Sequence, residues 1–215
     1  MLTTFPEKTT AFQLPSPVGE LEVVVEIPLT SSAKTTQLTA IVCHPHPLHG
    51  GTMNNKVVST MMKALLELGI PAVRFNFRGI GKSTGIYGEG VGEIQDLETV
   101  IDWVKQTRPG TTLWLGGFSF GTYISAAIAA RGDVARLISI APPIMHMNFQ
   151  SIAKMPCPWL VIQGDADEVF DAEEVFTWFA EKHPEADVVR MKAASHFFHG
   201  RLVELRENLI SKLSE

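Results

Sequence analysis

The chain has 215 residues, 45% of them hydrophobic, which suits one domain with a sizeable core spanning residues 1–215. Its net charge of −5 argues against a nucleic-acid-binding protein, which needs a basic face. No apolar run approaches the roughly 18 residues of a membrane span. We therefore expect neither nucleic acid nor membrane as a partner.

Both cysteines, Cys43 and Cys157, fall in predicted buried strands. Two packed free thiols are expected there rather than a disulfide, which is typical of a reducing compartment. The first residues also lack the basic start and apolar centre of a secretion signal. These features predict a cytoplasmic protein. We also expect it to be a monomer or a homodimer.

The chain begins with a predicted antiparallel hairpin over residues 8–27, where apolar and polar residues alternate around a Pro- and Gly-containing turn. From residue 38 onward, buried strands and amphipathic helices alternate at short spacing. The strands are expected at 38–43, 72–77, 113–118, 135–140, 158–163 and 188–191. The helices are expected after an N-cap at Asn54 or Asn55 and at 92–107, 122–130, 172–179 and 202–213. This alternation predicts an α/β fold, a three-layer sandwich with a mostly parallel, twisted sheet.

One stretch carries a chemical motif. Gly117-x-Ser119-x-Gly121 lies between an apolar strand and a helix of small residues. A serine in this context sits on a strained turn with its hydroxyl at the end of the sheet, and the flanking glycines let the backbones approach closely. Ser119 is therefore a candidate nucleophile.

A serine hydroxyl needs a base, and the base needs an orienting carboxylate. Asp167 and His196 each follow a later strand, at the sheet edge where ligands bind in such folds. Asp165 competes with Asp167, and His199 competes with His196. The Gly-x-x-Asp pattern favours Asp167, and His199 falls where the last helix begins.

Three motifs together resemble the α/β-hydrolase superfamily over nearly the whole chain. They are Gly117-Phe118-Ser119-Phe120-Gly121, Gly164-Asp165-Ala166-Asp167 and Ser195-His196-Phe197-Phe198-His199-Gly200. More narrowly, the chain is similar to the small lidless hydrolases grouped with dienelactone hydrolases and bacterial carboxylesterases. That likeness rests on the segments 44–47, 50–56 and 74–79. The resemblance implies a fold without a large cap, with Ser119 as nucleophile, Asp167 as acid and His196 as base. Dienelactone hydrolases proper carry cysteine where Ser119 stands, so their substrate is not implied.

An oxyanion hole needs two N–H donors. We expect one from Phe120, the residue after the nucleophile, and the other from His46, since Pro45 and Pro47 have no N–H. Zinc is the rival interpretation of this loop, with ligands among Cys43, His44, His46 and His49. We predict no metal and no cofactor, because Cys43 should point into the core.

The sequence thus predicts a serine hydrolase whose substrate is a small or medium carboxylic ester. Met145, Met147 and Phe149 are candidates for its acyl pocket, with core packing as the alternative. His146 is expected at the surface or pocket rim, and His183 in solvent. A thioesterase or peptidase, a metallohydrolase and a non-catalytic binding protein of the same fold are the alternative functions.

Overall fold

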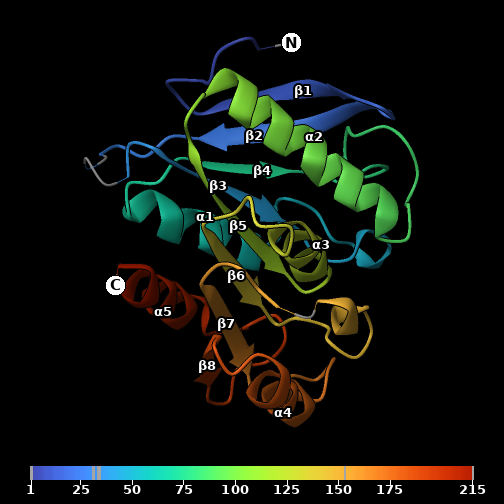
Figure 1. Ribbon diagram of the computed structural model, residues 1–215, viewed down its shortest axis with the longest axis vertical. Coiled ribbons are helices and arrows are strands. Elements are labelled where there is room, and N and C mark those ends of the chain that lie inside the picture. Colours follow the sequence, from blue (N-terminus) through green and yellow to red (C-terminus); the bar gives the residue numbers. More distant parts are fainter. Residues whose placement is uncertain (1, 31, 33–34, 153, 215) are drawn as a thin grey trace.

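The computed structural model describes residues 2–30, 32, 35–152 and 154–214, and within them one sheet has eight strands in the order β1-β2-β4-β3-β5-β6-β7-β8 (Figure 1). The strands are β1 (Thr10–Ser16), β2 (Gly19–Glu26), β3 (Leu38–Cys43), β4 (Ala72–Phe75), β5 (Thr112–Phe118), β6 (Arg136–Ile140), β7 (Trp159–Gly164) and β8 (Asp187–Met191). The helices are α1 (Lys56–Glu67), α2 (Val91–Thr107), α3 (Phe120–Ala129), α4 (Ala172–Lys182) and α5 (Leu202–Ser214).

The pairing of the strands confirms the predicted architecture. Strands β1 and β2 form the antiparallel hairpin, and β2 pairs antiparallel with β4. From β4 to β8 every pair is parallel. The carboxyl ends of β3, β5, β7 and β8 therefore lie at one edge of the sheet, and the loops that follow them carry the candidate site residues.

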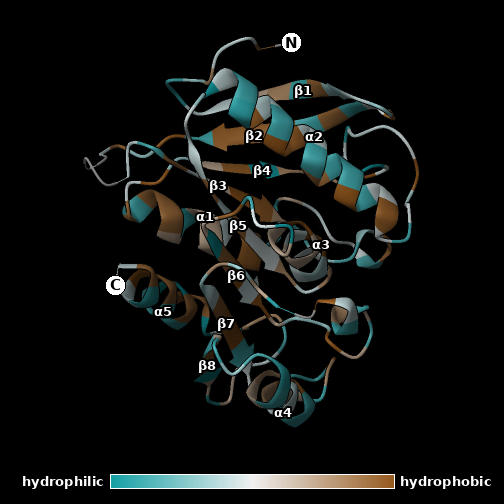
Figure 2. Cartoon of the chain, in the orientation of Figure 1, coloured by the Kyte–Doolittle hydropathy of each residue, from teal (hydrophilic) through white to brown (hydrophobic). Residues whose placement is uncertain are grey.

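The core divides into two clusters, one on each face of the sheet. One contains buried residues of α2, α3 and α4, including Leu97, Ile124 and Val175. The other contains buried residues of α1 and α5, including Val58 and Leu205. Figure 2 shows α2 with alternating hydrophobic and hydrophilic stripes, as expected of a helix with one face on the core. The three predicted layers are therefore present.

Helix α1 begins after an asparagine N-cap. The sequence alone did not decide whether this cap is Asn54 or Asn55. Asn55 is the N-cap, and its Oδ1 accepts the N–H of Val57 at 2.8 Å. The carboxamide of the neighbouring Asn54 instead accepts a hydrogen bond from Arg74 at 2.9 Å. Because its oxygen is held by the helix, the Asn55 side chain has a fixed orientation.

Two expectations about buried polar groups have different outcomes. Cys43 and Cys157 are buried free thiols, as predicted. The expectation that His183 is solvated is wrong, because its side chain is 2% exposed. Its ring packs against Trp159 and Trp178, and Nε2 donates to the carbonyl of Ile152 at 3.0 Å. The imidazole fills a space between large side chains, and its Nδ1 lies 2.9 Å from Oε1 of Glu185, so both ring nitrogens have a partner.

The connection between β6 and β7 is where a larger cap would be inserted. Its described part consists of turns and a short 3₁₀ helix, Phe149–Ser151. The prediction of a fold without a large cap is therefore confirmed. Among the described residues, no helix has both the length and the apolar character needed to cross a membrane.

Candidate active site

Ser119 occupies the sharp turn between β5 and α3. Its backbone has φ 51° and ψ −121°, a region that residues other than glycine rarely adopt. A Cβ at Gly117 would lie 2.3 Å from the carbonyl oxygen of Gly121, and a Cβ at Gly121 would lie 2.5 Å from that of Cys43. Both motif glycines are therefore required by close backbone approach, and this approach fixes the serine at the end of the sheet.

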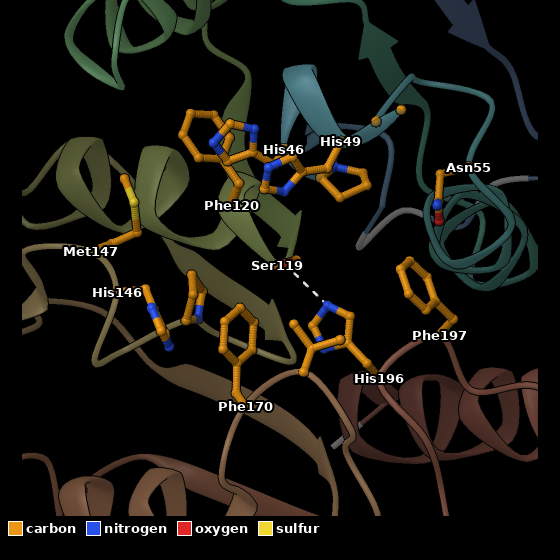
Figure 3. A pocket seen from close by; sticks show the side chains of 15 residues that line it. His46, His49, Asn55, Ser119, Phe120, His146, Met147, Phe170, His196 and Phe197 are labelled. Atoms are coloured by element: carbon orange, nitrogen blue, oxygen red, sulfur yellow. Dashed lines mark hydrogen bonds between the residues drawn. The ribbon is translucent and has the colours of Figure 1, made fainter.

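Ser119, His196 and Asp167 come from three loops and form one chain of hydrogen bonds. Nε2 of His196 lies 3.2 Å from Oγ of Ser119, the contact drawn in Figure 3. Nδ1 of His196 lies 2.8 Å from Oδ2 of Asp167. An ionised carboxylate only accepts hydrogen bonds, so Nδ1 carries the proton and Nε2 is free to accept the serine hydroxyl proton. The arrangement can take a proton from Ser119 when the oxygen attacks.

The carboxylate of Asp167 is held from several sides. Oδ1 accepts hydrogen bonds from the N–H groups of Val169 at 2.8 Å and Phe170 at 2.9 Å. Oδ2 also accepts a hydrogen bond from Nε2 of Gln163 at 2.9 Å. Burial by itself would raise the pKa of Asp167, but the contact with His196 and these donors outweigh it and lower the pKa below its usual value. Asp167 is therefore ionised at neutral pH and keeps the imidazole in the tautomer described above.

Two more carboxylates from the same turn hold the loop that carries His196. Oε2 of Glu168 accepts the backbone N–H of His196 at 2.9 Å, and Oδ1 of Asp165 accepts that of Ala193 at 2.6 Å. Asp165 therefore contacts the loop backbone and Asp167 contacts the imidazole. The competing His199 is exposed, and its ring packs on Phe197 at 5.9 Å between centroids. Sequence reasoning did not find Glu168.

Ser119 and His196 lie at the wall of a cavity of ≈ 470 Å³. It is lined by Pro45, His46, His49, Gly50, Gly51, Asn55, Ser119, Phe120, Pro143, His146, Met147, Val169, Phe170, His196 and Phe197. Among the candidate pocket residues, Met147 lines the cavity. The expectation for Met145 and Phe149 is wrong: Met145 is 58% exposed outside it, and Phe149 is 0% exposed in the core against Tyr123 and Trp178.

Comparisons with known proteins agree with this geometry. The sequence pattern of the alpha/beta hydrolase domain matches residues 38–208. The chain belongs to the α/β-hydrolase family. A solved α/β serine hydrolase homologue from Coxiella burnetii is similar, with 50% identity, a TM-score of 0.93, and coverage of 98% of this chain and 100% of the other.

Two further relatives support the membership. A lidless α/β serine hydrolase from Xanthomonas campestris has 48% identity and a TM-score of 0.91, over 96% of this chain and 94% of that chain. An uncharacterised protein from Rickettsia prowazekii is 35% identical over 175 residues, which is 77% of this chain and 74% of the relative. Within the family, this chain is thus similar over nearly its whole length to a hydrolase that is described as having no lid.

In this α/β hydrolase, the loop after β3 presents the N–H group of His46. Among the described residues, that N–H has no hydrogen-bond acceptor, and the N–H of Phe120 opens α3 and has none inside the helix. The peptide between Pro45 and His46 is held by His44, whose Nδ1 donates to the Pro45 carbonyl at 2.6 Å while Nε2 accepts the N–H of Phe77 at 3.0 Å. The loop therefore keeps a free donor in a fixed orientation.

The three histidines of this loop do not form a metal site. No group of three or more His, Cys, Asp or Glu side chains in the described part of the chain is arranged to hold a metal ion. His44 uses both ring nitrogens, and burial lowers its pKa to about 4, so it is neutral. His46 accepts the Leu48 N–H through Nδ1 at 3.2 Å, and its Nε2 donates to the hydroxyl of Tyr87 at 3.2 Å. Tyr87 is a second contact that sequence reasoning missed.

Proposed function

We propose that this α/β hydrolase is a serine hydrolase that cleaves small or medium carboxylic esters through an acyl-enzyme on Ser119. The observation that carries the proposal is the hydrogen-bonded chain from Ser119 through His196 to Asp167, which opens on a cavity of ≈ 470 Å³. Cavities of this size accommodate small organic molecules. The solved structures from Coxiella burnetii and Xanthomonas campestris are described as serine hydrolases, and this description supports the proposal.

The proposed reaction proceeds in two halves. Oγ of Ser119 attacks the ester carbonyl carbon as its proton passes to Nε2 of His196. The imidazolium gives that proton to the leaving alkoxide, which departs as the alcohol, and the acyl group stays on Ser119. Water then attacks the acyl-enzyme with His196 as base, releasing the acid and restoring the serine. Asp167 stabilises the imidazolium in both halves.

The negative charge on the carbonyl oxygen needs donors that are already in place. In our proposal these are the N–H groups of His46 and Phe120, whose orientation costs nothing at the moment of reaction. Gly121 and Gly117 contribute by allowing the turn that places Phe120 beside the nucleophile. No metal or organic cofactor has a part in this scheme.

The lining of the cavity favours an uncharged substrate. The part of the cavity wall that the structure describes contains no Asp, Glu, Lys or Arg side chain. A charged group would lose hydration there without gaining an ionic partner. A neutral ester fits this lining better than a charged peptide does.

The two buried free thiols support our expectation of a reducing cytoplasm, and a monomer or homodimer stays a prediction.

The experiment that tests the proposal compares three substrates that share a butyryl group: p-nitrophenyl butyrate, butyryl-CoA and butyryl anilide. We expect the highest kcat/KM for the ester, and loss of turnover in Ser119→Ala. Faster turnover of butyryl-CoA would make the protein a thioesterase, and faster turnover of the anilide would indicate an amidase or peptidase. Absence of turnover, together with absence of labelling by a fluorophosphonate, would mean a non-catalytic binding protein.

A further inference from the structure

The cavity extends to both sides of Ser119, and the two sides differ in chemistry. Figure 3 shows Met147 and His146 on one side of the serine and Asn55 and Phe197 on the other. His196 lies toward the side of Asn55 and Phe197, and the rings of His196 and Phe197 are 5.0 Å apart between centroids. We call these the Met147 arm and the Asn55 arm.

The position of His196 decides which part of an ester enters each arm. His196 must protonate the leaving oxygen, so the alcohol part of the substrate has to lie on the imidazole side of Ser119. The acyl part then extends in the opposite direction. On the proposed function, the Asn55 arm therefore receives the alcohol and the Met147 arm receives the acyl group.

The Asn55 arm carries an unused donor in a fixed place. Oδ1 of Asn55 is bound by the Val57 N–H at 2.8 Å, so the carboxamide cannot turn without losing the helix cap. Its Nδ2 group has no hydrogen-bond partner among the described residues. The half-buried carboxamide lines the cavity, so its N–H bonds are available to an oxygen of the ligand.

The Met147 arm has mainly aromatic and apolar side chains along its walls. Phe170 forms one wall, with the ring of His146 packed on it at 5.0 Å between centroids. The Met147 side chain lies close to Gly90, where an added Cβ would be 3.5 Å from the methionine methyl group. On the proposed function, an acyl chain in this arm contacts Phe170 and reaches Met147.

We propose that the substrates are esters of a short apolar acid with an alcohol that carries a hydrogen-bond-accepting oxygen, recognised by Nδ2 of Asn55. This inference rests on the proposed function and names its substrate class. An ether, carbonyl or hydroxyl oxygen near the ester can accept the bond. A purely hydrocarbon alcohol leaves the donor unpaired and loses about the strength of one neutral hydrogen bond.

Two isosteric esters test this recognition. 2-Methoxyethyl butyrate and n-butyl butyrate differ by one oxygen in place of a methylene group. The measurement is the ratio of kcat/KM for the ether ester to that for the butyl ester. We expect the wild type to favour the ether ester, and Asn55→Asp and Asn55→Ser to lower the ratio by about twofold to tenfold. Both replacements can cap α1, so folding is preserved, and circular dichroism and Tm check this.

The matched control is Asn54→Asp, the same chemical change one residue earlier, at an exposed position outside the cavity. It should keep the wild-type ratio. A wild type without preference for the ether ester, or an unchanged ratio in both Asn55 variants, would overturn the inference. A fall in Asn55→Asp alone would be an effect of charge and would also overturn it.

The failure of this inference can be told from failure of the proposed function. If the wild type hydrolyses the ether ester, the butyl ester and p-nitrophenyl butyrate, but the kcat/KM ratio is the same in the Asn55 variants, only the recognition by Asn55 is wrong. If it hydrolyses none of the three, the esterase proposal fails and this inference fails with it.

As a second measurement, Met147→Ala should shift the preferred p-nitrophenyl ester to a longer acyl chain, and an unchanged preference would contradict the assignment of the acyl arm.

Discussion

The backbone N–H of His196 donates to Oε2 of Glu168 at 2.9 Å, while Nδ1 of the same histidine lies 2.8 Å from the carboxylate of Asp167. Consecutive residues of one turn thus hold the backbone and the ring of the histidine. Asp165 adds a third contact, to the N–H of Ala193 at 2.6 Å. The turn after β7 therefore sets the position of the proposed base as well as its tautomer.

Removing the Glu168 side chain should loosen His196 without touching the substrate. We expect Glu168→Ala to lower kcat by about tenfold with little change in KM, because small misplacements of a reacting group slow the chemical step. Glu168→Gln keeps an acceptor oxygen and should restore most of the rate. Steady-state kinetics measure both, with the exposed Glu181→Ala as control. Equal losses in the Ala and Gln variants would show that the hydrogen bond does not position the base.

The two aspartates of the turn should differ sharply. Asp167→Asn should lower kcat by about 10⁴-fold, as in the serine-protease triad, because the amide favours the wrong imidazole tautomer. Asp165→Asn keeps an acceptor for the Ala193 N–H and should cost far less. Measuring kcat for both variants decides which aspartate orients the imidazole of His196. A larger loss in Asp165→Asn would exchange the roles that we assign.

The oxyanion role of His46 depends on its backbone and not on its imidazole. His46→Ala keeps the N–H, loses the contact with Tyr87 and should reduce kcat modestly. His46→Pro removes the N–H, and the loss of one oxyanion donor costs about 10²–10³-fold in kcat. Circular dichroism and Tm must show that the proline variant folds. Similar kcat values in the two variants would remove this residue from the oxyanion hole.

His44 should make the protein less stable in acid. Its pKa is lowered by burial to about 4, whereas an unfolded histidine titrates near about 6.5. Between these values the unfolded state binds more protons, so the free energy of unfolding falls as pH falls, by at most about 1.4 kcal/mol per unit. The contribution is fully present above about pH 6.5.

Urea unfolding between pH 7 and pH 5 measures this slope. His44→Gln lacks the titrating group and should lose stability less steeply than the wild type, while the exposed His199→Gln should follow the wild type. Parallel curves for wild type and His44→Gln would mean that folding does not lower the pKa of His44, and would contradict this account.

Much of the fold could be predicted because its signals are local. The apolar run 38–43 corresponds to β3, and the glycine spacing around Ser119 gives the turn between β5 and α3. Asn55 could not be separated from Asn54 by type, because both can cap a helix. Only the chain path, which turns the Asn54 carboxamide toward Arg74, decides between them. The assignment of residues 1–215 to a single domain stays a prediction.

The errors lie where side-chain direction depends on distant residues. In the segment after β6, Met145, Met147 and Phe149 stand at every second position, but the segment forms turns and a short 3₁₀ helix instead of a strand, so this spacing does not place them on one face. His183 looked solvated beside Pro184, but Trp159 and Trp178 enclose it. Glu168 and Tyr87 were missed because their partners, His196 and His46, are far away in the sequence and no local motif marks such contacts.

The central claim is that Ser119 is the nucleophile, and its most direct test is the intact mass of the protein after reaction with a fluorophosphonate. Peptide mapping then locates the adduct, and the kcat of Ser119→Ala on p-nitrophenyl butyrate is measured beside it. We predict a single phosphonyl adduct on Ser119 in the wild type and none in Ser119→Ala, with kcat lowered by up to about a million-fold in the folded variant. A Ser119→Ala protein that still takes the label or keeps the wild-type rate would contradict the assignment of Ser119 as the nucleophile.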